Sequence, residues 1–150
     1  TLLHTLQTTF CHTPSPTTQT AARLLDEYFA HRRDTFELSL LTIGTDFQRK
    51  VWDALLTVPY GATVTYQQLA TRIGHPKSAR AVGMAVGSNR ISIFLPCHRI
   101  VGAGHKLGGF AGGIEAKRRL LQLEADHVTT ETQTNHQTEI YKDVSSVASF

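Results

Sequence analysis

The residues of this chain best suited to chemistry are a cysteine and a histidine, Cys97 and His98, in the segment Pro96-Cys97-His98-Arg99. A thiolate is a strong nucleophile, and an imidazole is the usual base that generates one. Adjacent side chains of an extended chain point to opposite faces. We therefore expect His98 to reach the thiol across a turn or through a water. The pair alone leaves a second interpretation open, in which Cys97 is a small, inert, buried residue.

The segments on either side of this pair predict how it is held. The apolar run at residues 91–95 predicts a buried strand that ends at Pro96, and a glycine-rich loop follows at 102–113. Asn89 precedes the run and is typical of a helix C-cap. Residues 114–124 predict an amphipathic helix, and from the sequence alone Glu124 would be a solvated acid at its end.

Two capping boxes predict the helices that must position the rest of the site. Thr45 with Gln48 begins a helix that buries Phe47, Val51, Trp52, Leu55 and Leu56 and ends at Pro59-Tyr60-Gly61. Thr65 with Gln68 begins a short helix that ends at Gly74. A third helix, rich in Ala and Gly, is predicted at residues 77–87. A helix, a short turn and a small-faced basic helix together indicate a helix-turn-helix.

The two ends of the chain give weaker signals. Residues 1–20 show little pattern, residues 21–31 have the spacing of a helix, and residues 36–40 alternate like a short strand. Residues 127–150 are polar and predict a mobile tail or a lightly docked extension. The predicted organisation is a short N-terminal segment at 1–43, a main domain at 44–126 and a C-terminal tail at 127–150.

The charge distribution indicates a polyanionic partner. The net charge is only +3, but no Asp or Glu occurs from Ala54 to Ile114. The same stretch contains six basic residues, namely Arg72, Lys77, Arg80, Arg90, Arg99 and Lys106. Phosphate contact is the leading explanation, and an ordinary solvated basic surface is the alternative.

Composition excludes several other classes of protein. Of the 150 residues, 41% are hydrophobic and 18% charged, which is typical of a soluble globular domain. No apolar run approaches the roughly 20 residues of a membrane span, and no signal peptide is visible. The two cysteines, Cys11 and Cys97, are expected to be free thiols. The isolated pair Cys11-His12 gives little support for zinc, so we expect no metal and no cofactor.

Taken in order, the motifs resemble the O6-alkylguanine-DNA alkyltransferase family from about Gly44 to Glu124. The matching residues include Gly44-Thr45, Phe47-Gln48, Val51-Trp52, Thr65-Tyr66, Leu69-Ala70, Ala79-Arg80-Ala81-Val82-Gly83, Asn89, Pro96-Cys97-His98-Arg99, Lys117, Leu120-Leu121 and Glu124. The resemblance implies an α+β fold. Its main part is a mainly helical, winged-helix-like DNA-binding domain with a helix-turn-helix and short strands. A reduced or truncated α/β N-terminal part would precede it.

The same resemblance implies direct-reversal DNA repair. Cys97 would take an alkyl group from O6 of guanine in one irreversible turnover, without metal, nucleotide or methyl donor. His98 would act as base through a water, with Glu124 orienting it. Asn89 would brace the turn at the thiol, and Tyr66 would donate a proton toward guanine N3.

The resemblance also assigns contacts to double-stranded DNA, approached by a monomer from the minor groove. Arg80 would fill the space that an everted O6-alkylguanine leaves. Further contacts to the sugar–phosphate backbone are expected from Tyr66, Gln48, Gln67, His75 and Ser78. The alkyl pocket would be lined by Met84, the Ile100 carbonyl, Phe110 and the Ala111 amide.

Three residues depart from the pattern of the family. Phe110 and Ala111 stand where many relatives have Tyr and Ser, and His105 stands where relatives usually have Gly. If that position needs a positive φ, His105 is strained but tolerated. Which alkyl groups fit, and whether O4-alkylthymine is a substrate, stay open.

Two other functions are alternatives to alkyl transfer. A damaged-DNA-binding protein of the alkyltransferase-like type would lack the reactive cysteine, so Cys97 argues against it. A cysteine hydrolase would have its histidine distant in sequence, whereas His98 is adjacent to the thiol. An alkyltransferase would be cytoplasmic and associated with the nucleoid, or nuclear in a eukaryote.

Overall fold

The computed structural model describes residues 13–147, with side chains for residues 13–130. The chain divides between Ser39 and Leu40 into two units. We call residues 1–39 unit 1 and residues 40–150 unit 2, and each is described by itself. The predicted boundary at residues 43 and 44 lies slightly farther along the chain.

The described part of unit 1, residues 13–39, contains the helix α2 (Pro16–Phe29). Ser15 is its N-cap and forms a capping box with Thr18, and Pro16 occupies the first turn, where a missing N–H costs nothing. The predicted strand at residues 36–40 is wrong, because this segment is irregular. Alternation alone cannot form a strand, and the sheet of the described residues contains only the two strands of unit 2.

Three short helices of unit 2 confirm the helix-turn-helix outline. They are α3 (Asp46–Leu55), α4 (Tyr66–Arg72) and α5 (Ala79–Gly87). The capping boxes of Thr45 and Thr65 are both present. Gly74 ends the α4 turn with φ 78°, a left-handed conformation that suits glycine. The third helix begins at Ala79, two residues later than predicted.

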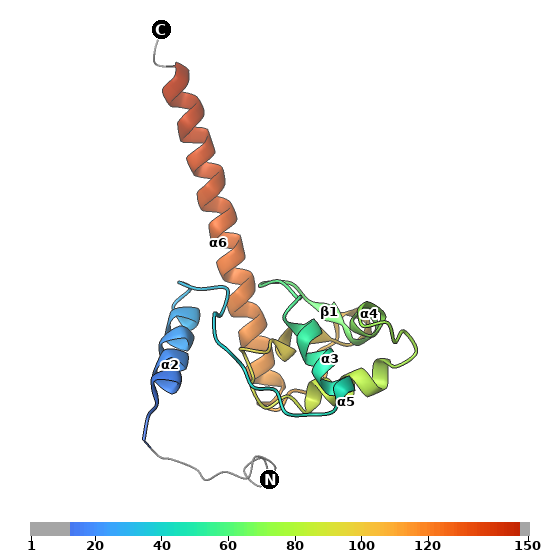
Figure 1. Cartoon of the computed structure of the whole chain (residues 1–150). Coiled ribbons are helices and arrows are strands. Elements are labelled where there is room, and N and C mark those ends of the chain that lie inside the picture. The colour runs from blue at the N-terminus through green and yellow to red at the C-terminus, as the bar shows by residue number, and fades with distance from the viewer. Residues whose placement is uncertain (1–12, 148–150) are drawn as a thin grey trace. The chain divides into compact units, whose positions relative to one another are not determined.

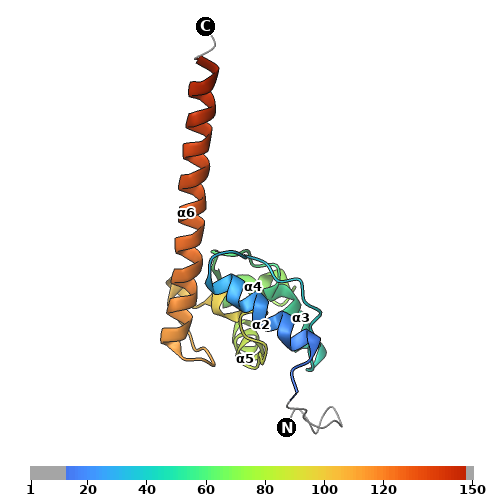
Figure 2. The same cartoon turned by 90° about the vertical axis from the view of Figure 1, so that its left-hand side faces the viewer.

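The core of unit 2 holds these helices against one another, and α5 packs on both α3 and α4. The indole Nε1 of Trp52 donates to the Ala85 carbonyl at 2.9 Å, which ties α3 to α5. Figures 1 and 2 show the three helices grouped beside the first turns of α6. The buried apolar residues are Val51, Trp52, Leu55, Val58, Val64, Leu69, Ala70, Ile73, Val82, Ala85, Val86, Leu95, Cys97 and Ile100.

A two-stranded parallel sheet brings the reactive segment to the helix-turn-helix. β1 (Val64–Thr65) pairs with β2 (Ile100–Val101), with Val64 opposite Ile100. The strand β1 leads directly into α4. The strand β2 follows directly after the 3-10 turn η1 (Cys97–Arg99). The sheet therefore places the thiol segment next to the start of the helix-turn-helix.

The predicted strand at residues 91–95 is wrong. Its only ladder contact in the described structure is an isolated bridge between Ser92 and Leu95. Ile93 has φ 75°, which is strained for a β-branched residue and interrupts an extended chain. The apolar side chains of this run fold back as a loop instead of lying along a sheet.

The last helix, α6, is longer than predicted and spans Ile114–Val147. The composition of residues 127–147 predicted a polar extension, yet the chain has no Gly or Pro after Gly113 to end a helix. A second 3-10 turn, η2 (Ala103–His105), lies in the loop before α6. Among the described residues, none of the helices is both long and apolar enough to cross a membrane.

Candidate active site

Cys97 lies in the turn η1, where its side chain is free of any disulfide and 5% exposed. The buried Asn89 holds this turn. Its amide nitrogen donates to the Leu95 carbonyl and to Cys97 Sγ, both at 3.1 Å, and its oxygen accepts from the Ile91 amide at 2.9 Å. Asn89 thus braces the turn at the thiol, as expected, and also places a hydrogen-bond donor on the sulfur.

His98 is fully buried and pairs with Glu124, which lies 26 residues later on α6. The His98 Nε2 to Glu124 Oε1 distance is 2.7 Å. The predicted partnership of these two residues is therefore present in the structure. The expectation from sequence alone, a solvated Glu124 at a helix end, is wrong because this carboxylate is entirely buried.

The Glu124 carboxylate accepts hydrogen bonds from His98, Arg99 and the Gly61 backbone. Besides His98, Arg99 donates from Nε at 3.0 Å and from Nη2 at 2.9 Å, and the Gly61 amide donates to Oε2 at 3.0 Å. Burial alone would raise the pKa of Glu124. Hydrogen bonds and charges from His98 and Arg99 outweigh burial and lower the pKa from 4.5 to about 2. Glu124 is therefore a carboxylate at neutral pH.

This arrangement determines which nitrogen of His98 can act as a base. A carboxylate accepts hydrogen bonds only, so Nε2 carries the proton that Glu124 accepts. The other nitrogen, Nδ1, is buried and makes no hydrogen bond to the residues that the structure describes. Nδ1 is therefore the ring nitrogen that is free to form a further hydrogen bond.

Sequence reasoning missed the role of Arg99. Arg99 is 6% exposed, its Nη1 donates to the Val58 carbonyl at 2.8 Å, and its guanidinium lies 5.5 Å from the centre of the Tyr60 ring. Arg99 therefore belongs to the interior and does not contribute to the basic surface. The sequence signal for this buried role was the position of Arg99 directly after His98, whose partner Glu124 also pairs with Arg99.

Lys117 is a second buried charge that sequence reasoning used only as a family marker. Its side chain is fully buried and donates to the Ile100 carbonyl. Burial lowers the pKa of Lys117 below its ordinary 10.5, and the charge of Cys97 opposes that lowering. Lys117, Leu120 and Glu124 share one face of α6. A lysine and a glutamate on an otherwise apolar helix face were the sequence signal for buried charges.

Tyr66 begins α4 and approaches the glycines of two neighbouring segments. A Cβ built on Gly83 would lie 3.6 Å from the Tyr66 ring, and one on Gly108 would lie 2.9 Å from the hydroxyl. Burial, and then the charge of Cys97, raises the pKa of Tyr66 above its ordinary 10. The hydroxyl therefore carries its proton at neutral pH and faces the loop that follows β2.

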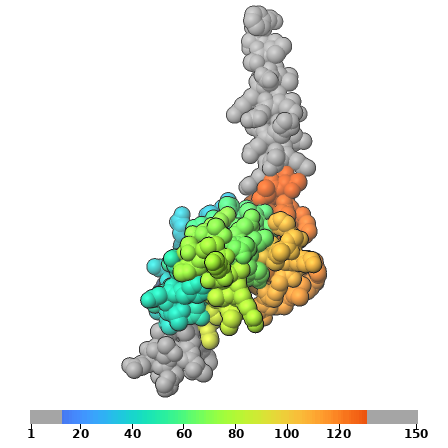
Figure 3. Space-filling view, turned by 90° about the vertical axis from the view of Figure 1, so that its right-hand side faces the viewer, coloured from blue at the N-terminus to red at the C-terminus, as the bar shows by residue number. Residues whose placement is uncertain are grey.

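The residues expected to contact DNA gather around the turn between α4 and α5. Arg80 is exposed, and Ser78 is the N-cap of α5 with a hydroxyl that makes no capping bond. Gln67 bridges the turn through the Pro76 carbonyl at 2.6 Å. Figure 3 shows this green part of unit 2 adjoining the orange part that comes later in the chain.

Two further residues expected at DNA have contacts within the protein. The ring of His75 lies 5.6 Å from that of Phe47. Gln48 caps α3 and donates to Ser88 Oγ at 3.1 Å, so its amide is already engaged. It lines a cleft of about 350 Å³ with Ile43, Trp52, Gly87, Ser88, Asn89 and Arg90.

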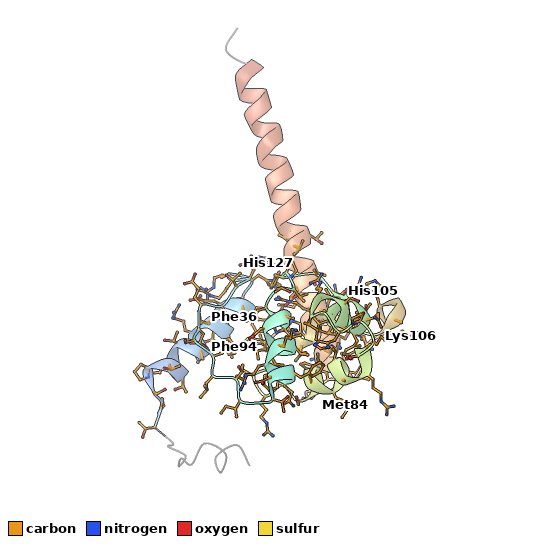
Figure 4. The ribbon with its side chains drawn as sticks, turned by 45° about the vertical axis from the view of Figure 1, so that its right-hand side comes forward. Phe36, Met84, Phe94, His105, Lys106 and His127 are labelled. Atoms are coloured by element: carbon orange, nitrogen blue, oxygen red, sulfur yellow. The ribbon has the colours of Figure 1, made fainter. Side chains whose placement is uncertain are left out.

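The residues that were predicted to line one pocket differ in their burial. Ile100 is buried, and Phe110 is half-buried and packs against the core that includes Cys97, whereas Ala111 is exposed. The prediction for Met84 is wrong, because its side chain is 73% exposed on the outer face of α5. Figure 4 shows Met84 pointing outward at the lower edge of the domain.

His105, which stands where members of the resembled family usually have Gly, lies in the loop before α6. His105 has φ 57°, so this position does need the left-handed conformation in which a glycine would be unstrained. Its Nδ1 lies 3.2 Å from Thr63 Oγ1, a contact that helps to hold the strained residue.

The described residues offer no group of three or more His, Cys, Asp or Glu side chains that could hold a metal ion. The pair Cys11 and His12 lies outside the described residues. The arrangement around Cys97 consists of a buried thiol, an imidazole held by a carboxylate and an amide donor.

Comparison with known proteins places this arrangement in a family. Residues 46–126 match the family described as 6-O-methylguanine DNA methyltransferase, DNA binding domain. A methylated-DNA–protein-cysteine methyltransferase of Mycobacterium tuberculosis is 54% identical over 100 residues, which are 67% of this chain and 61% of that protein. The protein of the same name from Methanosarcina barkeri is 47% identical over 108 residues, 72% of this chain and 68% of the relative.

Solved structures agree with the sequence match. The crystal structure of Mycobacterium tuberculosis OGT in complex with DNA superposes with a TM-score of 0.73 and 50% identity, over 77% of this chain and 71% of that one. The chain spans about 61% of the length of the mycobacterial relatives that it matches. With more than half of its residues within the matched domain, this chain belongs to the 6-O-methylguanine DNA methyltransferase family.

Proposed function

We propose that this protein repairs DNA by direct reversal, with Cys97 taking an alkyl group from O6 of guanine in a single irreversible turnover. The observation that carries this proposal is the linked set of contacts at the thiol. Asn89 donates to Cys97 Sγ. Glu124 holds the ring of His98, the residue that follows Cys97 in the sequence. The Nδ1 atom of His98 makes no hydrogen bond to the described residues. Family membership and the names of the relatives support the same activity.

The first step generates the nucleophile. A water between the two side chains takes the thiol proton of Cys97 and passes a proton to His98 Nδ1. Glu124, already ionised, accepts from Nε2 and stabilises the imidazolium that forms. The donor from Asn89 and the ammonium of Lys117 favour the negative charge on sulfur.

The second step transfers the alkyl group. The Cys97 thiolate attacks the alkyl carbon in line, and an S–C bond forms as the C–O6 bond breaks. The electron pair of that bond remains on guanine, which takes a proton at N3 from the Tyr66 hydroxyl. The product is a thioether, which is not hydrolysed, so each protein molecule reacts once.

The burial of the thiol favours a mechanism in which the damaged base leaves the helix. Cys97 is only 5% exposed, so an alkyl group must be brought into the domain instead of meeting sulfur at its surface. A base within the duplex is out of reach of such a site. We propose that an everted guanine enters while Arg80 fills the space it leaves.

The exposed face of α5 suits the minor groove. It carries Arg80 and the small residues Ala81 and Gly87, and Ser78 presents a hydroxyl at the helix N-terminus, where phosphate is favoured. We propose that the protein binds DNA there as a monomer, in the compartment that holds the DNA: the cytoplasm, or the nucleus in a eukaryote.

Intact mass spectrometry tests the activity. The wild type and the Cys97→Ser variant are incubated with duplex DNA that contains O6-methylguanine. We expect the wild type to gain the mass of one methyl group in place of a thiol hydrogen, and the variant to gain nothing. Binding without a gain in mass would indicate a damage-binding protein, and turnover beyond one equivalent would indicate a different mechanism.

A further inference from the structure

An exposed methionine on the proposed DNA-binding helix has no role in the chemistry above. Met84 is the only methionine in the chain and is 73% exposed, although α5 buries its other large apolar residues, Val82 and Val86. Exposed apolar side chains are common on protein surfaces, so exposure alone decides nothing. The position of Met84 on the helix is informative.

Met84 shares one face of α5 with Arg80. The two residues are four apart, and side chains at this spacing lie one above the other on a helix. Gly87 follows three residues later on the same face, and the space around it is open, since a Cβ there would meet no atom within 4 Å. The face thus has two long side chains, one basic and one apolar, on a surface of small residues.

The charge of the surroundings identifies the partner of this face. No acidic residue occurs between Ala54 and Ile114, and Arg72, Lys77, Arg80, Arg90 and Lys106 are all exposed. This acid-free stretch of exposed basic residues favours a polyanionic partner, and Arg80 places one of these charges on the same helix face as Met84. Proteins that bind the minor groove frequently insert apolar side chains, methionine among them, between base steps and thereby unstack them. Methionine suits this position because it is unbranched and adapts its shape.

We propose that Met84 is an apolar wedge that enters the minor groove one helical turn beyond Arg80 and helps to open the base stack. This inference rests on the proposed function and adds a residue that acts on duplex DNA only. Met84 would contact sugars and base edges, whereas Arg80 would occupy the space of the everted base. Met84 is a positioning residue, since it does not touch the reacting atoms.

Single-turnover rates on two substrates test the proposal, with Met84→Ala compared against Met84→Leu and Leu56→Ala. Leu56 is a matched control, because it is 58% exposed but lies at the end of α3. With O6-methylguanine in duplex DNA, we expect Met84→Ala to react about tenfold more slowly, which corresponds to about 1.4 kcal/mol. Met84→Leu should retain most of the rate, and Leu56→Ala should equal the wild type. With free O6-benzylguanine, all variants should react like the wild type.

The salt dependence of binding to undamaged duplex separates an apolar contact from an ionic one. Met84→Ala should weaken binding but leave the slope of log affinity against log salt unchanged. Arg80→Ala should reduce the magnitude of that slope by about one, which is the change expected for the loss of one phosphate contact. A changed slope for Met84→Ala would contradict the apolar role.

Two results would overturn the inference. Duplex rates that are equal for Met84→Ala and Leu56→Ala would show that no wedge acts. Equal slowing on the duplex and on the free base would show that Met84 acts through the fold. Failure of the proposed function is a separate result, because the wild type itself would then transfer no methyl group.

Discussion

Replacing Glu124 by Gln should destabilise the domain and abolish transfer, because this carboxylate neutralises a buried arginine and orients the histidine. The fall in its pKa from 4.5 to about 2 on folding corresponds to about 3 kcal/mol. Removal of one partner from a buried ion pair costs a similar amount, about 3–5 kcal/mol. We therefore expect the Glu124→Gln variant to lose about 3 kcal/mol of unfolding free energy at pH 7.

The pH dependence makes this prediction more specific. Because the folded-state pKa is lowered, the stabilisation is complete above pH 4.5 and is lost as the pH falls toward 2. Urea unfolding of wild type and variant should therefore differ most at pH 7. By pH 3 the difference should have shrunk by roughly 2 kcal/mol.

Glu115→Gln provides the matched control on the same helix. Glu115 pairs with Arg118 and Arg119 on the surface, where its side chain is 61% exposed. This variant should remain within about 0.5 kcal/mol of the wild type. The reasoning about Glu124 would be refuted if Glu124→Gln were as stable as Glu115→Gln, or if its deficit stayed the same from pH 7 to pH 3.

Four further substitutions test the roles of other residues. Lys117→Met should keep the fold, since it removes a buried charge. It should slow the reaction of the Cys97 thiol with iodoacetamide at pH 7 by about threefold to tenfold. An unchanged rate would show that the Lys117 ammonium does not affect the thiol. Gly61→Ala should cost about 2–3 kcal/mol in urea unfolding, because Gly61 has φ 73° and a Cβ there would lie 2.7 Å from an α6 side chain. Gly74→Ala, with φ 78° and open space, should cost only about 1 kcal/mol, and equal losses would rule out the clash. Arg80→Ala should slow transfer from duplex DNA by about a hundredfold but leave free O6-benzylguanine unaffected, and equal slowing on both would exclude a role in base eversion.

The parts of the fold that depend on local chemistry were predictable from the sequence. The hydroxyls of Thr45 and Thr65 cap their helices through bonds to residues three positions later, so the signal and the structure lie in the same few residues. Gly74 ends its helix for an equally local reason, since its left-handed φ suits glycine.

The errors arose where distant contacts decide the structure. The run at residues 91–95 has strand-forming side chains, but the Asn89 side chain bonds to backbone at both ends of it and Ile93 turns the chain. The helix predicted to end near Glu124 continues to Val147. The polar composition of residues 127–147 indicates exposure to solvent, but it does not indicate that a helix ends.

The active site was predictable only in part for a related reason. The resemblance identified Cys97, His98 and Glu124 as residues that act together, which periodicity could not do across 26 positions. The burial of Arg99 and Lys117 follows from packing between α6 and the turn before β2, and a linear pattern does not contain that packing. Met84 was misplaced because its face on α5 depends on which side of the helix meets the core.

The most direct test of the central claim is the stoichiometry and position of the transferred group. The protein is incubated with an excess of duplex DNA containing O6-methylguanine, digested, and the methylated peptide is identified and quantified over time. We expect methylation to rise to one group per protein molecule, on Cys97, and then to stop. Methylation of any other residue, or a fully folded protein whose Cys97 stays unmodified, would contradict it.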